Sequence, residues 1–259
     1  MKSQSGSLGW GPILGGLTGL TMALSLYLMF IYAPADAVQG NAQRIFYIHV
    51  PMAWDAYLAF FVVFVAGIGY LWKRSAFWDQ LGRASAEIGL VLTTLVLISG
   101  SLWGRPIWGT WWTWDARLTT TLILWFMYLG YFMLRAYAGE RERAARFAAV
   151  LGIVAFVDVP INYLSVQWWR TLHPTEVVSL EHAAMPGSML LTLMVSLLAF
   201  TLLYVFLLRQ KWAIEQAKDR LIDYQLAEYE RQAQGEAQRA VPGQAQPQQA
   251  QVKEGVSLG

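Results

Sequence analysis

Six long apolar segments constrain the fold of this chain more than any other feature of its sequence. Each is about 20 residues long, the length that an α-helix needs to cross the hydrocarbon core of a bilayer. They cover residues 12–33, 52–72, 84–102, 119–136, 147–166 and 187–208. Because lipid offers the backbone no hydrogen-bond partners, each segment has to be helical. The sequence therefore predicts an all-α integral membrane protein with six transmembrane helices within residues 1–208.

The composition supports this class and excludes several others. Hydrophobic residues make up 56% of the 259 residues and charged residues 14%, against roughly 45–50% and 25% in soluble domains. A net charge of +2 is too small and too scattered to indicate nucleic-acid binding. The absence of cysteine excludes disulfides, iron–sulfur ligation and thioether attachment of a cofactor. The sequence has no phosphate-binding loop motif, so an ATPase would have to be another chain.

The distribution of Lys and Arg between the connecting loops predicts the orientation of the spans. The turns after the second, fourth and sixth segments carry most of these residues, namely Lys73, Arg74, Arg83, Arg135, Arg141, Arg143, Arg146, Arg209 and Lys211. This bias places both termini in the cytoplasm. Residues 34–51, 103–118 and 167–186 then form three longer loops on the outer face.

The chain after residue 208 changes character twice. Residues 209–232 are charged and carry spaced apolar side chains, which predicts a cytosolic amphipathic helix. Residues 233–259 consist largely of Gln, Ala, Pro and Gly, a composition typical of disorder.

The second outer loop contains the stretch WGTWWTWDAR, residues 108–117, with Trp108, Trp111, Trp112 and Trp114. Tryptophan anchors proteins at membrane interfaces, but such anchors are spread around a bundle rather than gathered in seven positions. We interpret these four residues as an aromatic platform for a flat amphipathic ligand, on a helix lying in the membrane plane. A porphyrin has this shape, with a broad apolar face and two carboxylates on one edge.

Histidines in the outer loops complete this interpretation. His49 precedes the second segment and His173 follows the fifth. Haem iron can take one histidine on each side, so two histidines beside an aromatic platform indicate haem. A lone loop histidine is more often simply solvated, and this is how we interpret His182 in the last outer loop.

Three stretches of the sequence resemble one known family. WGTWWTWDARLTT is similar to the tryptophan-rich signature of the haem-handling superfamily of cytochrome c biogenesis. APADAVQGNAQRIFYIHVP and VDVPINYLSVQWWRTLHP, around His49 and His173, resemble the patterns of the heme exporter protein C (CcmC) family within that superfamily. The six-span layout agrees with this resemblance, which weakens after residue 208.

The resemblance implies a non-enzymatic site that holds haem b transiently and without a covalent bond. Proteins of this family bind haem on the periplasmic face of the bacterial inner membrane through the two loop histidines, which here are His49 and His173. They present it to the periplasmic haem chaperone CcmE, and they work with CcmD and the ABC transporter CcmA/CcmB.

The charged residues near these motifs receive roles as hypotheses. Arg44 and Arg117 are expected to face the haem propionates or the charges of a partner, although loop arginines also bind lipid phosphates. Asp115 has three alternatives: pairing with Arg117, bonding an indole N–H, or contacting the chaperone.

Two other functions remain as alternatives. A haem lyase of the same superfamily would attach haem to apocytochrome, but such proteins are larger and carry histidines inside their spans, whereas none of the six predicted spans contains one. A haem-translocating transporter subunit needs polar groups or a broken helix near the midplane. Only Asp158 and Pro160 suggest this, with Pro160 predicted to kink the fifth segment.

Overall fold

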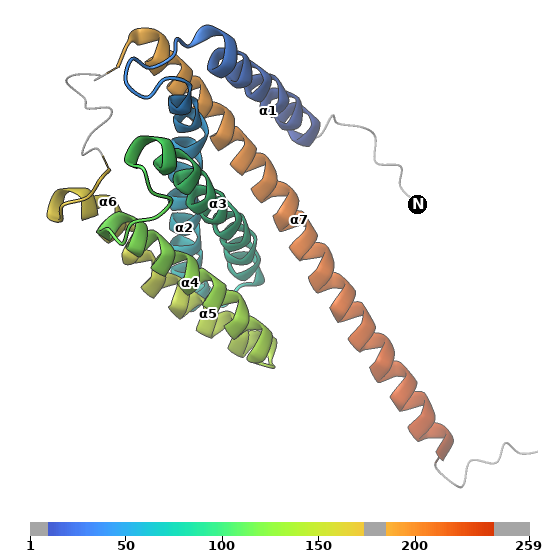
Figure 1. Cartoon of the computed structure of the whole chain (residues 1–259). Coiled ribbons are helices and arrows are strands. Elements are labelled where there is room, and N and C mark those ends of the chain that lie inside the picture. The colour runs from blue at the N-terminus through green and yellow to red at the C-terminus, as the bar shows by residue number, and fades with distance from the viewer. Residues whose placement is uncertain (1–9, 174–184, 241–259) are drawn as a thin grey trace, which may run out of the picture. The chain divides into compact units, whose positions relative to one another are not determined.

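The computed structural model describes residues 10–173 and 185–240, and within these it is built from helices (Figure 1). The only β-type pairing in the described residues is an isolated bridge between Asp36 and Gly40. The chain divides into two compact units, Met1–Glu215 and Gln216–Gly259, which we describe separately. Six helical segments are long and apolar enough to cross a membrane, so the predicted all-α fold with six spans is confirmed.

The helices extend beyond the predicted spans at several ends. The first unit contains α1 (Trp10–Tyr27), a π-helical turn η1 (Leu28–Tyr32), a short 3-10 helix η2 (Asn41–Ile45), α2 (Phe46–Lys73), α3 (Ala76–Trp108), α4 (Ala116–Tyr137), α5 (Arg141–Phe156), α6 (Asp158–Trp168) and the first part of α7 (Gly187–Ala240). Helices α2 and α3 include Pro51 and Pro106 near the ends, where sequence reasoning expected loop. The expected loop position of His49 is therefore wrong, because this residue lies in α2.

The fifth span is broken at Val157, between α5 and α6. Pro160 has no N–H, so it cannot donate to the carbonyl of Phe156 as a residue of a continuous helix would. Just before Pro160 the helix narrows to a tighter turn, in which the N–H of Val157 donates to the carbonyl of Val154, three residues back, at 3.1 Å. The predicted kink is confirmed.

Close helix contacts build the core of the bundle. Phe60 of α2 and Tyr128 of α4 are fully buried and stack with their ring centroids 3.8 Å apart. A Cβ atom on Gly89 of α3 would lie 2.5 Å from the ring of Phe60. Lipid is as apolar as leucine, so packing at this distance, rather than removal of apolar surface from water, holds such helices together.

Helix α7 joins the first unit along residues 187–215. Its Ser196 bonds Ser25 of α1 at 2.8 Å, and its Thr201 donates to Asp55 of α2 at 3.0 Å. In the second unit, residues 216–240 continue as helix. The predicted disorder is therefore wrong for residues 233–240, while residues 241–259 lie outside the described part of the chain.

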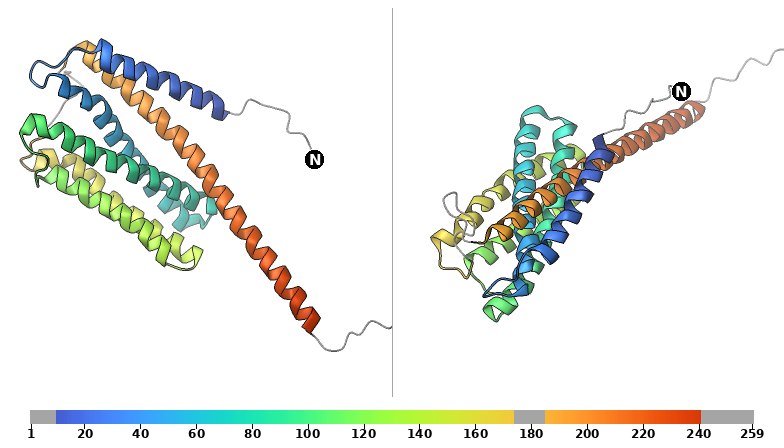
Figure 2. Two further views of the ribbon diagram at one scale, coloured as in Figure 1. Left: turned by 45° about the vertical axis from the view of Figure 1, so that its right-hand side comes forward. Right: turned by 90° about the horizontal axis from the view of Figure 1, so that it is seen from above.

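The connections of the first unit fall at two opposite ends (Figures 1 and 2). The η1–η2 connection, the segment 109–115 and the residues after α6 lie at one end, which we call the site end. The short turns after α2 and α4 lie at the other, which carries most of the Lys and Arg residues.

Ion pairs tie the helices together at that other end. Arg135 of α4 bonds both carboxylate oxygens of Asp79 in α3, at 2.7 and 3.0 Å. Arg83 lies 3.5 Å from Asp79 and 3.4 Å from Glu215 of α7, and Lys211 reaches Glu87 at 2.7 Å. Because Asp79 and Arg135 are almost fully buried, each charge depends on its partner.

Replacing Asp79 with alanine should lower the free energy of unfolding by about 3 kcal/mol, because it leaves the guanidinium of Arg135 buried without its counter-charge. Thermal unfolding of the detergent-solubilised protein measures this loss. The matched control is Glu142→Ala, which removes an exposed pair with Arg146 at 3.0 Å and should cost about 0.5 kcal/mol or less. Equal losses in the two variants would contradict the prediction.

Candidate functional site

A cavity of about 920 Å³ lies among α2, α3, α4, α6 and α7 towards the site end of the bundle. This volume falls near the upper end of the range of about 300–1,000 Å³ that is common for small-molecule and cofactor sites. The expected ligands His49 and His173 both line it. The fold therefore brings together two histidines that are more than a hundred residues apart in the chain.

His49 is held by α3. Its Nδ1 lies 2.9 Å from the hydroxyl oxygen of Ser99, and Trp103 meets the ring edge-on at a centroid distance of 5.8 Å. Gly100 makes this approach possible, because a Cβ atom there would lie 3.1 Å from the imidazole. With Nδ1 engaged by Ser99, Nε2 is the nitrogen left to coordinate a metal.

His173 also has a polar side chain near Nδ1 and a tryptophan beside its ring. Its Nδ1 lies 3.6 Å from a carboxylate oxygen of Asp115, and Trp108 meets the ring edge-on at 5.1 Å. Its backbone N–H donates to the hydroxyl of Thr171 at 3.0 Å. A carboxylate behind the second ring nitrogen is the usual means of orienting a ligating histidine. Asp115 thus supports His173, an alternative that sequence reasoning did not include.

The charges around His173 act on it in opposite directions. Burial lowers the pKa of the imidazole, the carboxylate of Asp115 opposes that shift, and Arg117 adds to it. The net shift is downward from the ordinary value of 6.5. Since only a neutral imidazole has a lone pair for a metal, the shift keeps His173 ready to coordinate in mildly acidic solution.

The tryptophan stretch is not a helix in the membrane plane, so that expectation is wrong. Trp108 ends α3, and Gly109 turns the chain with φ of 76°, a left-handed conformation that glycine adopts easily. Residues 110–115 are irregular, and α4 begins after Asp115. The side chain of Asp115 accepts the N–H of Leu118 at 3.0 Å and so caps α4.

Three of the four platform tryptophans line the cavity, namely Trp108, Trp111 and Trp112. Trp114 does not, and it is 76% exposed. It contacts Trp112 edge-on at 5.6 Å. Sequence reasoning missed Trp103, which lines the cavity beside His49.

The two arginines with expected roles are placed differently. Arg117 lines the cavity, and its guanidinium lies 3.5 Å from the carbonyl of Tyr163. Arg44 is not among the lining residues. Its guanidinium instead donates to the carbonyl of Met29 and, at 3.2 Å, to the side chain of Asn41, so it holds the η1 turn against η2.

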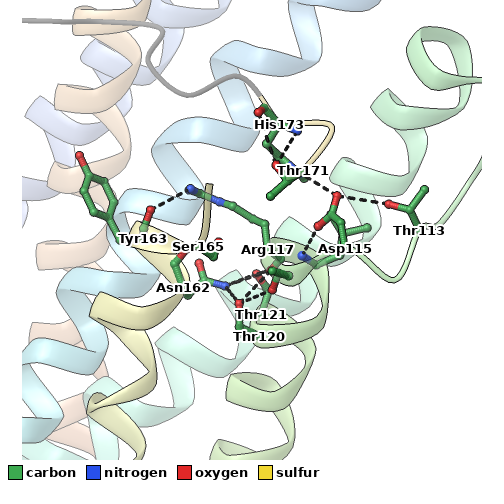
Figure 3. Close-up of polar contacts among 12 residues, drawn as sticks. Thr113, Asp115, Arg117, Thr120, Thr121, Asn162, Tyr163, Ser165, Thr171 and His173 are labelled. Carbon is green, nitrogen blue, oxygen red and sulfur yellow. Dashed lines mark hydrogen bonds and ion pairs between the residues drawn. The ribbon is translucent and has the colours of Figure 1, made fainter. Parts of the chain in front are cut away.

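A buried asparagine joins the helices beneath the site (Figure 3). Asn162 of α6 donates to the hydroxyls of Thr120 and Thr121 at 2.6 and 2.8 Å and to the carbonyl of Arg117 at 3.0 Å. It also accepts a hydrogen bond from Tyr57 of α2. Its place within one of the quoted motifs was the only sequence signal for this role, because its partners lie far away in the chain.

This donor set suits a metal that brings most of its own ligands. Among the described residues, no group of three or more His, Cys, Asp or Glu side chains could hold a bare ion. Two histidines in the lining of one aromatic cavity fit a metal already held in a planar ring. Because His49 lies in α2, the absence of histidine from the spans no longer separates this chain from haem lyases.

The fold and the site define a class: a six-span helical membrane protein with a large aromatic cavity that contains two histidines. Comparison with known proteins agrees with this class. The heme exporter protein C family model matches residues 4–224, and the chain belongs to this family.

Individual relatives support the same assignment. A heme exporter protein C of Bradyrhizobium diazoefficiens is 44% identical over 197 residues, which cover 76% of this chain and 74% of the relative. Its counterpart in Haemophilus influenzae is 36% identical over 211 residues, covering 80% and 85%. The one from Escherichia coli strain K12 is 44% identical over 145 residues, covering 56% and 59%.

Replacing Asp115 with asparagine should lower the pKa of His173 further, because it removes the carboxylate that opposes the effect of burial. Asparagine caps helices as well as aspartate does, so α4 should remain intact. Titration of the imidazole protons by NMR, in a background of His49→Gln and His182→Gln, measures the shift. Glu142→Gln, at the opposite end of the bundle, is the control, and an unchanged pKa in D115N would rule out the contact.

Proposed function

We propose that this protein binds haem in the cavity and delivers it for cytochrome c maturation, with His49 and His173 as the two axial ligands. The observation that carries the proposal is that both histidines line one cavity, each with an edge-on tryptophan and a polar partner for Nδ1. The names of the relatives, which are called heme exporters, support the choice of ligand.

A hydrogen bond with Ser99 fixes the tautomer of His49, and the carboxylate of Asp115, 3.6 Å from Nδ1, favours the same tautomer of His173. Ser99 can accept the Nδ1 proton of His49, and Asp115 faces the Nδ1 proton of His173. Both Nε2 atoms are then free to coordinate iron. The bound haem b brings four in-plane nitrogens, so the protein supplies only the two axial positions. With no covalent attachment, the cargo remains transferable.

The remaining lining residues match the rest of the haem molecule. Trp108, Trp111 and Trp112 offer apolar surface to the macrocycle. Arg117 is the cavity-lining guanidinium and suits a propionate. Trp114 is exposed beside them, which suits contact with the acceptor of the haem.

The setting we propose is the bacterial inner membrane, with the site end facing the periplasm. The support is the Lys and Arg bias towards the opposite end of the bundle. There the haem would pass to the periplasmic chaperone CcmE, in a complex with CcmD and the ABC transporter CcmA/CcmB. Since the sequence has no phosphate-binding loop, ATP hydrolysis would belong to the transporter.

One observation favours the alternative of a translocating subunit. The break between α5 and α6 at Val157 places Asp158 in the first turn of α6, with one carboxylate oxygen buried and unpaired. Broken helices with polar groups line the substrate paths of many transporters. Passage of haem across vesicles that contain this protein alone would favour that function over binding and delivery.

Alanine at His49 or at His173 should abolish the bis-histidine visible spectrum of the haem-loaded protein, because either change removes an axial ligand. Absorption spectra of the purified variants after addition of haemin check this. His182→Ala, outside both histidine motifs, is the control and should keep the spectrum. If H49A and H173A both retain it, the ligand assignment is wrong.

Leucine at Trp112 should weaken haemin affinity by about tenfold, which corresponds to the loss of about 1.4 kcal/mol of aromatic contact. Leucine at Trp114 should leave the affinity unchanged, because this side chain does not line the cavity. Titration followed by absorbance compares the two variants, which lie two residues apart in the same segment. Equal affinity in both would mean that the tryptophans only anchor the protein at the interface.

A further inference from the structure

The cavity reaches the side of the bundle as well as its end. Trp54 of α2, Tyr163 of α6 and Met194 of α7 all line it. The same side chains are 57%, 60% and 42% exposed. Large exposure of side chains that line a cavity is expected where its wall is thin or open. These three residues, from three different helices, therefore mark a lateral opening, which we call the side opening.

The side opening lies along the length of the helices rather than at their ends. Trp54, Tyr163 and Met194 are five to eight residues from the ends of their helices at the site end, which is roughly 8–12 Å at 1.5 Å per residue. The hydrocarbon core of a bilayer is about 30 Å thick. The three residues also lie inside the predicted spans 52–72, 147–166 and 187–208, so an opening there would face the leaflet on the side of the site.

The helix packing explains why the wall is open there. Helix α6 packs mainly on α4 and α5 rather than on α2. The hydrogen bond from Tyr57 to Asn162 joins α2 and α6, one turn deeper in α2 than Trp54. This hydrogen bond closes the gap between α2 and α6 below the opening.

We propose that haem enters the cavity sideways from this leaflet, through the side opening; this rests on the function proposed above. An amphipathic macrocycle partitions into a bilayer with its apolar face among the lipid chains and its carboxylates near the headgroups. Its apolar edge can slide between Trp54 and Tyr163 without crossing water. The guanidinium of Arg117 lies 3.5 Å from the backbone carbonyl of Tyr163, so a cation stands beside the opening to receive the trailing carboxylates.

The competing route is entry from water at the site end. Trp111 lines the cavity there and is 56% exposed, so this end is accessible too. A route from water requires haem to leave the membrane before it binds, whereas the side route keeps its apolar face covered throughout. The two routes differ in which donor, lipid or aqueous, supplies the haem.

The absence of cysteine from the chain allows the side opening to be blocked selectively. Met194→Cys, labelled with a bulky membrane-permeant maleimide, is reconstituted in vesicles whose lipid contains haemin. We expect the bis-histidine absorbance to appear about tenfold or more slowly than in unlabelled M194C, within the range over which association rates vary among variants of one site. Leu198→Cys is the matched control, because Leu198 is 55% exposed one turn further along α7 but does not line the cavity.

A second donor separates the routes. Haemin supplied as an aqueous albumin complex to the labelled M194C in detergent should bind with much less slowing than haemin from lipid, because the label blocks the side opening and not the site end. Tyr163→Cys, on a different helix, repeats the test if M194C does not fold. Undiminished uptake from lipid by both labelled variants would overturn the side route, as would an equal slowing from both donors. If the unlabelled variants show no bis-histidine spectrum, the haem assignment itself fails and the route fails with it.

Discussion

The buried hydrogen bonds of Asn162 are the interaction on which the rest of the site depends. The side chain is fully buried and joins α6 to the first turns of α4 and to Tyr57 of α2. In an apolar interior, every one of these polar groups would be costly to leave unpaired. Their mutual satisfaction selects one arrangement of three helices. Since α2 carries His49 and α4 follows Asp115, this arrangement also sets the distance between His49 and Asp115.

Asp115 connects this arrangement to His173. One oxygen of its carboxylate caps α4 by accepting the N–H of Leu118. The other oxygen faces the imidazole of His173. The position of His173 therefore depends on α4, the helix that Asn162 holds in place. Hydrophobic contacts alone would not achieve this in a membrane, because one apolar surface packs on lipid nearly as well as on another. Directional polar contacts at the start of α4 supply the orientation.

The sequence predicts the spans well because their length and hydropathy are local properties, and Pro160 marks the break in the fifth for the same reason. The tryptophan stretch was predicted as a helix although Gly109 and Asp115 are ordinary stop and start signals. Contacts between residues far apart in the chain could not be predicted from the sequence. Ser99 behind His49 and the ties of Asn162 depend on which helices meet, and nothing in one sequence specifies that.

In the first unit, the buried ion pairs and the cavity lie at opposite ends. At one end, buried charges such as Asp79 and Arg135 bind α3 to α4, and Glu215 adds α7. At the site end, the same helices separate around a large cavity. An open cavity forfeits the packing that its walls would otherwise make, so the bundle needs strong contacts elsewhere. Because α3 and α4 run from one end to the other, the ion pairs at the end opposite the cavity tie together two helices that also line it.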